Sequence, residues 1–313
     1  MYTLKKRKPL KILTLGFSSI IIGSALIFTA CATGSKSYNA ALDELDEFAP
    51  LDAGGIVYLY IDAVKARPIL DAVELPGMGS MDKKQRDQVF DRTSSAVAAY
   101  YPETGDRRFL VAAQGAYPSA RANMSFGFSS AWKKRRSQTG DAYWYSVQNK
   151  LSVSLSPSRA FISDGDPFVQ PSGTQSPEGL APFRQEAVLA GWVDNGAAPI
   201  NRFLAGLNIP IEIPAGRVLF GVYQREQGYE ARIRIETPSA SQARGVAAII
   251  SMARLFMPPP ASADDSLTDP LALAGVLFAN PPKQEGVYLD VHTGPLNKKG
   301  ISLLFNMFSV YSK

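Results

Sequence analysis

The first 31 residues determine which part of this 313-residue chain is available to fold. They begin with a basic stretch, continue in an apolar run over residues 12–28, and end at Cys31, the only cysteine. The basic residues of this stretch are Lys5, Lys6, Arg7, Lys8 and Lys11. A charged start, a short apolar run and small residues at its end are typical of a secretory signal peptide. We therefore predict that residues 1–30 are a signal peptide and that the protein is exported.

The residues before Cys31 support a second prediction. The segment 27–31, Ile-Phe-Thr-Ala-Cys, resembles the lipobox of bacterial lipoproteins, with Phe28 where Leu is usual. The resemblance implies that Cys31 receives a diacylglycerol thioether, becomes the mature N-terminus and is acylated on its amino group. Several acyl chains, at about 0.8 kcal/mol per buried CH₂, anchor a protein stably. Residues 31–54 would then form a lipidated N-terminus and tether. The alternative is a plain signal peptide or an uncleaved helix with an incidental cysteine.

The charge balance changes once the signal peptide is removed. The whole chain has 33 Lys and Arg against 28 Asp and Glu, a net charge of +5. Five of the basic residues and no acidic residue lie in the signal, so the mature chain is neutral. A neutral mature chain gives no support for nucleic-acid binding. With Cys31 lipidated and His292 the only histidine, cysteine-based and multi-histidine metal sites are excluded, and we expect no cofactor.

Two pairs of segments indicate an internal duplication. Residues 55–63 and 187–195 both have the pattern of a buried strand that ends near an Asp and leads into a short Pro-initiated helix. Residues 108–127 align without gaps with residues 217–236, and both have the pattern of a hairpin. We expect an α+β fold of two similar α/β halves, with mostly antiparallel sheets and amphipathic helices. Chance similarity of simple strand and turn patterns is the alternative.

Composition divides the mature chain after the tether into three parts. The first half covers residues 55–168, and the second half covers residues 187–313. Residues 169–186 are rich in Pro, Ser and Gly, as expected of a linker. In the first half we expect a helix at 81–100 and strands at 143–147, 151–155 and 160–163. In the second half we expect helices at 239–256 and 297–311 and strands at 272–279 and 286–291.

Residues that could carry chemistry are few, and each has a simpler structural explanation. Asp62 and Asp194 occupy matching positions, but helix capping explains them better than an aspartic dyad does. His292 follows a predicted strand, where a lone histidine is more often a strand-end or turn residue. Residues 163–166, Ser-Asp-Gly-Asp, lack the distal Glu of a calcium-binding loop and fit a tight turn. We therefore expect a protein that is not an enzyme.

Two segments are candidates for surface contacts. Residues 133–136, Lys-Lys-Arg-Arg, form the densest basic run after the signal and could meet anionic headgroups, although a solvated hairpin tip is favoured. The last predicted helix is apolar over most of its circumference, so protein, a partner or lipid must cover it. We expect Ile301, Leu304, Phe305 and Phe308 to contact a membrane or a partner. Burial of this helix between the two halves is the alternative.

A family resemblance follows from these features together. A lipobox, a neutral α+β body and helices with wide apolar faces resemble spirochaetal outer-membrane lipoproteins, and most closely the treponemal thirty-kilodalton lipoprotein family. The resemblance implies a tether in the periplasmic leaflet of the outer membrane and helices that enter the bilayer. Only Cys31 can be matched to a functional residue of that family. The absence of Asp after Cys31 also favours the outer membrane, if the sorting rule of enterobacteria applies.

The sequence therefore predicts a non-enzymatic, lipid-anchored envelope lipoprotein at the periplasmic face of the outer membrane. Its acyl chains would bind membrane lipid, and its amphipathic helices would contact the membrane or an envelope protein partner. The alternative function is that of a receptor for a lipid or small ligand, with a pocket between the two halves, where domain interfaces commonly place binding sites.

Overall fold

The computed structural model describes most of the chain between residues 57 and 301. The described residues are 57–70, 83–101, 109–169, 183–184, 186–194, 196–197, 201, 205, 212–226, 228–256, 275–298 and 300–301. The signal peptide, Cys31, the tether, most of the linker and residues 302–313 lie outside them.

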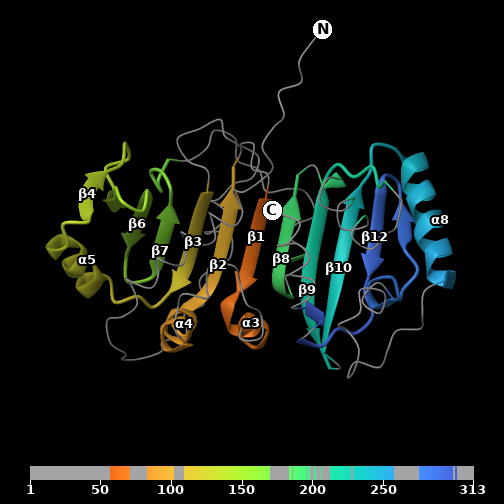
Figure 1. The fold of residues 1–313 in the computed structure, drawn as a ribbon, viewed down its shortest axis with the longest axis horizontal. Helices are drawn as coiled ribbons and strands as arrows, with labels where there is room; N and C mark the ends of the chain where they lie inside the picture. Colours follow the sequence, from red (N-terminus) through yellow and green to blue (C-terminus); the bar gives the residue numbers. More distant parts are fainter. Residues whose placement is uncertain are drawn as a thin grey trace, which may run out of the picture.

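In the described part of the chain, twelve strands form one sheet, and every pair of neighbours in it is antiparallel (Figure 1). The order across the sheet is β11-β12-β10-β9-β8-β1-β2-β3-β7-β6-β5-β4. The strands of the first part of the chain are β1 (Val57–Asp62), β2 (Thr93–Tyr100), β3 (Phe109–Gly115), β4 (Trp132–Arg136), β5 (Ala142–Ser146), β6 (Leu151–Leu155) and β7 (Arg159–Ser163). Those of the second part are β8 (Ala187–Val193), β9 (Val218–Arg225), β10 (Gly228–Glu236), β11 (Lys283–Glu285) and β12 (Tyr288–His292).

The centre of the sheet corrects the predicted fold class. Strand β1 pairs with β2 on one side and with β8 on the other, with Val57 opposite Val193. The structure is therefore mostly one large antiparallel sheet with few helices, and the prediction of two α/β halves with amphipathic helices is wrong. Pairing β1 with β8 satisfies backbone groups that two separate sheets would leave exposed at their edges.

The two segments of the second predicted repeat have different structures. Residues 217–236 contain the hairpin of β9 and β10, as predicted. The matching segment in the first part forms β3 and then helix α5 (Ser119–Phe128) in place of a second strand. In α5, Ala122 and Phe126 are buried four residues apart, whereas Met124 between them is exposed. Buried positions four residues apart are typical of a helix face, so the segment is not the hairpin strand that alternation suggested.

Two further predicted elements have the wrong type. Helix α4 (Lys83–Phe90) ends early, and residues 93–100, predicted as helix, form β2. In β2 the buried side chains of Ser95, Val97 and Ala99 alternate with less buried ones, which is the period of a strand. Residues 275–277, predicted within a strand, form a helical turn.

Several local predictions are confirmed. The predicted strands at 143–147, 151–155 and 160–163 correspond to β5, β6 and β7. The long helix of the second part is α8 (Ala240–Phe256), and the strand after it is β12. Asp62 caps α3 (Ala63–Leu70), because its carboxylate accepts a hydrogen bond from the Lys65 N–H at 3.0 Å. Pro68 lies inside α3, so this helix does not begin at a proline as expected.

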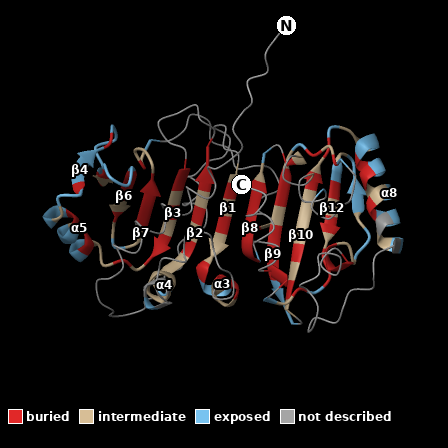
Figure 2. Ribbon diagram, viewed as in Figure 1, coloured by how far each residue is buried: buried red, intermediate tan, exposed pale blue. Residues whose placement is uncertain are grey.

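Side chains pack on both faces of the central strands. These strands are accordingly coloured as buried or intermediate in Figure 2. One face carries an aromatic cluster that includes Tyr58, Tyr60, Trp192 and Tyr223. The opposite face packs against α3, whose Ile69 belongs to a second buried cluster. Both clusters contain side chains of β1 or its neighbour β8, so burial is continuous where the two parts of the chain meet.

One helix packs at each end of the sheet. Helix α5 lies near β4 and places Phe126 4.7 Å from the ring of Trp132 and 5.8 Å from that of Trp144. Helix α8 lies near β11 and β12 and buries Val246 and Ile250. The two helices therefore close opposite ends of the same sheet (Figure 1).

Candidate functional site

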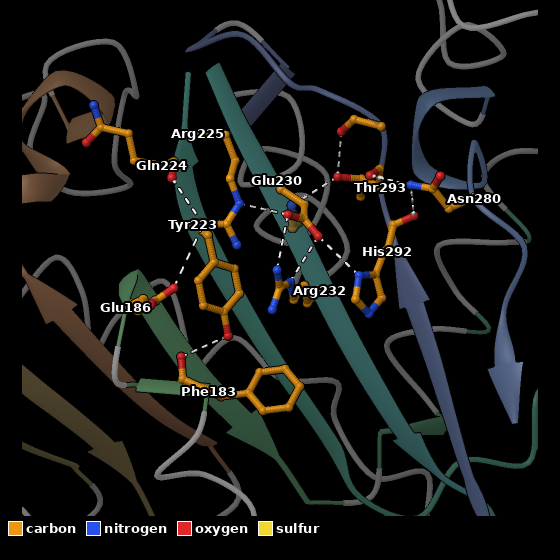
Figure 3. A network of polar contacts seen from close by, with 12 residues as sticks. Phe183, Glu186, Tyr223, Gln224, Arg225, Glu230, Arg232, Asn280, His292 and Thr293 are labelled. Carbon is orange, nitrogen blue, oxygen red and sulfur yellow. Dashed lines mark hydrogen bonds and ion pairs between the residues drawn. The ribbon is translucent and has the colours of Figure 1, made fainter. Parts of the chain in front are cut away.

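The densest group of charged side chains in the described part of the second half lies on β9, β10 and β12 (Figure 3). Alternate residues of β10 lie on one face of the sheet, so Glu230 and Arg232 are neighbours there. The antiparallel register places Tyr223 of β9 opposite Glu230 and places His292 of β12 opposite Arg232. Residues up to 69 positions apart thereby meet in one network.

Glu230 is the centre of this network. Its carboxylate accepts hydrogen bonds from Nε of Arg225 at 3.0 Å and from Nε of Arg232 at 2.9 Å. Nδ1 of His292 lies 3.1 Å from the same carboxylate. Burial alone would raise the pKa of Glu230, but the hydrogen bonds and charges of Arg232 and Arg225 outweigh it and lower the pKa to about 2. The carboxylate therefore stays ionised over the physiological range.

Tyr223 joins this network to the chain before β8. Its hydroxyl donates a hydrogen bond to the backbone carbonyl of Phe183 at 2.9 Å. The guanidinium of Arg232 lies 4.6 Å from the Tyr223 ring centroid, and that of Arg225 lies 5.3 Å away. Burial raises the pKa of Tyr223 to about 12, although the two arginines act in the opposite direction. The hydroxyl is therefore a hydrogen-bond donor at neutral pH.

A second ion pair continues the same face of β10. Arg234 of β10 and Asp290 of β12 are directly opposite in register. Their side chains form two parallel hydrogen bonds, with Nε to Oδ1 at 2.7 Å and Nη2 to Oδ2 at 2.8 Å. The hydrogen bonds to Asp290 raise the pKa of Arg234. This bidentate geometry is the stronger form of an arginine–carboxylate pair.

The network is suited to holding strands together. A general base must accept a proton near neutral pH, and a carboxylate with a pKa of about 2 that already accepts several hydrogen bonds is a poor one. The charges pair across β9, β10 and β12 and so fix their register. Within the described residues, no group of three or more His, Cys, Asp or Glu side chains is placed to hold a metal ion.

His292, Asp62 and Asp194 were also singled out from the sequence, and all three lie at or directly after the ends of strands. Strand β12 ends at His292, which confirms it as a strand-end residue. Asp62 ends β1, while Asp194 follows β8, which runs antiparallel to β1. The two carboxylates therefore lie at opposite ends of the paired strands, about 20 Å apart along them, and do not form a dyad.

The predicted contact residues fall mostly outside the described chain. Ile301 is fully buried and packs in the cluster that contains Leu296 and Val276. Leu304, Phe305, Phe308 and the lipidation site Cys31 lie outside the described residues, and their roles stay predictions.

Exposed apolar side chains gather on the two end helices. On α5, Phe128 is 86% exposed and Met124 is 62% exposed. On α8, Leu255 is 81% exposed and Met252 is 59% exposed. The α5 pair was missed from the sequence because its segment was interpreted as a strand. A helical period applied to residues 119–128 would have placed Met124 and Phe128 together.

The basic run at residues 133–136 lies beside α5. These residues belong to β4, an edge strand that pairs only with β5 in the described sheet. All four basic side chains are exposed. The turn of this hairpin follows at residues 137–141, so the run forms a strand edge and not a hairpin tip. None of the helices in the described ranges is long and apolar enough to cross a bilayer.

Of the comparisons with known proteins, only the one with solved structures finds a similarity to this chain. Comparison with protein families and with curated proteins finds no match. The fold is similar to that of TP0453, a treponemal outer-membrane-associated lipoprotein. Crystal form III has 18% sequence identity and a TM-score of 0.54, and the match covers 83% of this chain and 98% of that one. Crystal form I has 18% identity and a TM-score of 0.52, with 86% and 99% covered.

This similarity shows a shared fold along nearly the whole of TP0453. It agrees with the resemblance to treponemal outer-membrane lipoproteins that the sequence suggested. At 18% identity it carries no residue-level role from TP0453 to this chain.

Proposed function

We propose that this protein is a non-enzymatic envelope lipoprotein, anchored through acyl chains on Cys31 to the periplasmic face of the outer membrane. The observation that supports this most is the fold shared with an outer-membrane-associated lipoprotein over 83% of the chain. The lipobox-like segment at Cys31 supports it independently, because it rests on the sequence alone and would provide the anchor.

A role outside catalysis fits the chemistry of the described residues. The single histidine of the chain contacts Glu230, and that carboxylate is held ionised by Arg225 and Arg232. These side chains stabilise the sheet and are not arranged as a nucleophile and its base. The proposed activity is contact with membrane lipid or with an envelope partner.

The alternative of a receptor with a pocket between two halves is less well supported. Strands β1 and β8 are hydrogen-bonded neighbours at the place where that pocket was expected. Side chains from both parts, such as Tyr60 and Trp192, pack together across this joint.

The anchor is tested by expressing the full chain in a lipoprotein-processing bacterium with a labelled fatty acid. We expect label on the wild-type protein, an acylated N-terminal peptide that begins at Cys31 by mass spectrometry, and recovery with outer membranes. The Cys31→Ser variant should lose the label and leave the membrane fraction. An unlabelled wild-type protein, or a labelled Cys31→Ser variant, would contradict the proposal.

A further inference from the structure

The charge of the mature chain is distributed very unevenly. Residues 109–163, which run from β3 to β7, contain seven Lys and Arg but only one acidic residue, Asp141. Because the mature chain is neutral, the rest of it carries six more acidic than basic residues. One end of the sheet is therefore strongly positive, although the whole protein has no net charge.

The positive charges lie beside exposed apolar side chains. Lys134 faces Trp144, with Nζ 6.0 Å from the ring centroid, and Phe126 of α5 packs on the same ring. Lys134 and Arg136, two residues apart on β4, therefore lie on the side of the hairpin that α5 covers. On the outer surface of α5, Arg121, Met124 and Phe128 are exposed at helical spacing. We call these five residues the basic-apolar surface: Arg121, Met124, Phe128, Lys134 and Arg136.

Protection of the sheet edge explains only part of this surface. Lysine and arginine on an edge strand discourage pairing with another chain. That need does not account for Phe128 and Met124, whose exposure leaves apolar area in water. Bulky apolar residues beside Lys and Arg are the composition that binds at an anionic lipid interface.

The opposite end of the sheet has this combination only in part. Helix α8 also exposes Met252 and Leu255 and carries Arg244 at the surface. Its neighbour β11, however, adds Glu285 beside Lys283. A carboxylate among basic residues weakens their attraction to an anionic surface. The complementarity to anionic lipid is therefore stronger at the α5 end, where four adjacent basic residues of β4 are exposed.

The proposed anchor allows this end to reach the bilayer. Twelve strands at about 4.8 Å spacing make a sheet about 55 Å wide, with β1 near its centre. The chain from Cys31 to Val57 spans at most about 90 Å when fully extended, so its length does not prevent either end from touching the membrane.

We infer that the basic-apolar surface docks on an anionic lipid leaflet, with Phe128 and Met124 at the headgroup boundary and the basic residues against lipid phosphates. The inference rests on the proposed membrane anchor and assigns the contact to a defined face.

The test uses the mature chain, residues 31–313 with Cys31→Ser, which keeps every described residue and removes the acyl anchor. Binding is measured by co-sedimentation with vesicles of phosphatidylcholine alone and with about one third phosphatidylglycerol. Lys134→Gln with Arg136→Gln is compared with Arg244→Gln with Lys283→Gln, which removes the same charge at the other end. Phe128→Ser with Met124→Ser is compared with Leu255→Ser with Met252→Ser. Thermal unfolding of each variant establishes that it is folded.

We expect binding to the anionic vesicles only. The Lys134 and Arg136 changes should together weaken it by about twenty-fivefold, since each basic residue near such a surface contributes about fivefold. The Phe128 and Met124 changes should weaken it by about tenfold. Both control variants should bind like the unsubstituted chain.

Three results would overturn the inference. Equal binding by all four variants would show that another face makes the contact, and the proposed lipid anchor would still stand. Loss of vesicle binding in the α8 variants alone would assign the contact to the opposite end of the sheet. Binding to soluble polyglutamate that needs Lys134 and Arg136 but not Phe128 would identify an acidic polymer in place of lipid. Failure of Cys31 acylation is a separate result, because the vesicle assay uses a chain without the acyl anchor.

Discussion

The two ends of the sheet use charge in opposite ways. At the β9–β10–β12 end, Glu230 and Asp290 are each paired with arginines across neighbouring strands. At the β4 end, four adjacent basic residues are exposed, and Asp141 is the only acidic residue from 109 to 163. Paired charges satisfy one another and stabilise the fold, whereas charges of one sign remain available to an outside partner. One continuous sheet therefore has a structural end at β9, β10 and β12 and a binding end at β4.

Among changes to charged residues, removing one charge at the paired end should have the largest effect on stability. Glu230→Gln leaves Arg225 and Arg232 without their carboxylate, and we expect it to lower the free energy of unfolding by about 2 kcal/mol. Lys134→Gln with Arg136→Gln should change it by less than about 0.5 kcal/mol, because these side chains are exposed. Urea unfolding measures both, and equal destabilisation would remove the distinction between the ends.

Lowering the pH should reduce the stability that the paired end contributes. The pKa of Glu230 is about 2 in the folded protein and 4.5 as its ordinary value, so the unfolded chain binds the proton first as pH falls. The stability that Glu230 contributes is therefore fully present above pH 4.5 and is lost as pH falls toward 2. After allowance for solvent screening, we expect a loss of about 1 to 2 kcal/mol over this range. Unfolding curves at successive pH values should show this slope in the wild type and a flatter one in Glu230→Gln.

The second ion pair should give a smaller, separable contribution. Because Arg234 and Asp290 are bidentate but partly exposed, a double-mutant cycle with Arg234→Gln and Asp290→Asn should yield a coupling of about 1 kcal/mol. High salt should reduce this coupling. A coupling near zero would mean that the pair fixes geometry without stabilising the fold.

The smallest effect is expected at the binding end. Phe128→Ser should change stability by less than about 0.5 kcal/mol, since its side chain is already in water. Two residues earlier, Phe126 is buried against Trp132, and Phe126→Ala should cost about 3 kcal/mol. A large loss of stability in Phe128→Ser would show that this residue supports the fold rather than a contact.

The sequence predicted elements whose pattern is local. The apolar stripe of α8, the hairpin of β9 and β10, and the cap at Asp62 all depend on residues close together in the chain. The secondary-structure predictions were wrong where the same residues fitted both a helical and a strand period. Residues 122–127 alternate like a strand, yet Ala122 and Phe126 lie one helical turn apart. The small residues of β2 fitted a helix face but pack as a strand.

The long-range features were not accessible from one sequence. Nothing local to β1 or β8 indicates that these strands pair with each other and merge the two parts into one sheet. Glu230 and His292 are 62 residues apart, and only the register of β10 with β12 brings them together. The basic run beside Trp132 was visible, but its meaning changed once α5 proved to be a helix with Phe128 on its outer surface.

The contrast between the two ends is tested most directly by a fluorescent residue at each end. Phe128→Trp and Leu255→Trp are introduced separately into the acylated protein, which is then bound to anionic vesicles that contain brominated acyl chains. Unsubstituted protein provides the background from the native tryptophans. The account predicts that the added fluorescence at residue 128 shifts to the blue and is quenched, while that at residue 255 is unchanged. Equal quenching at both ends, or quenching only at residue 255, would contradict it.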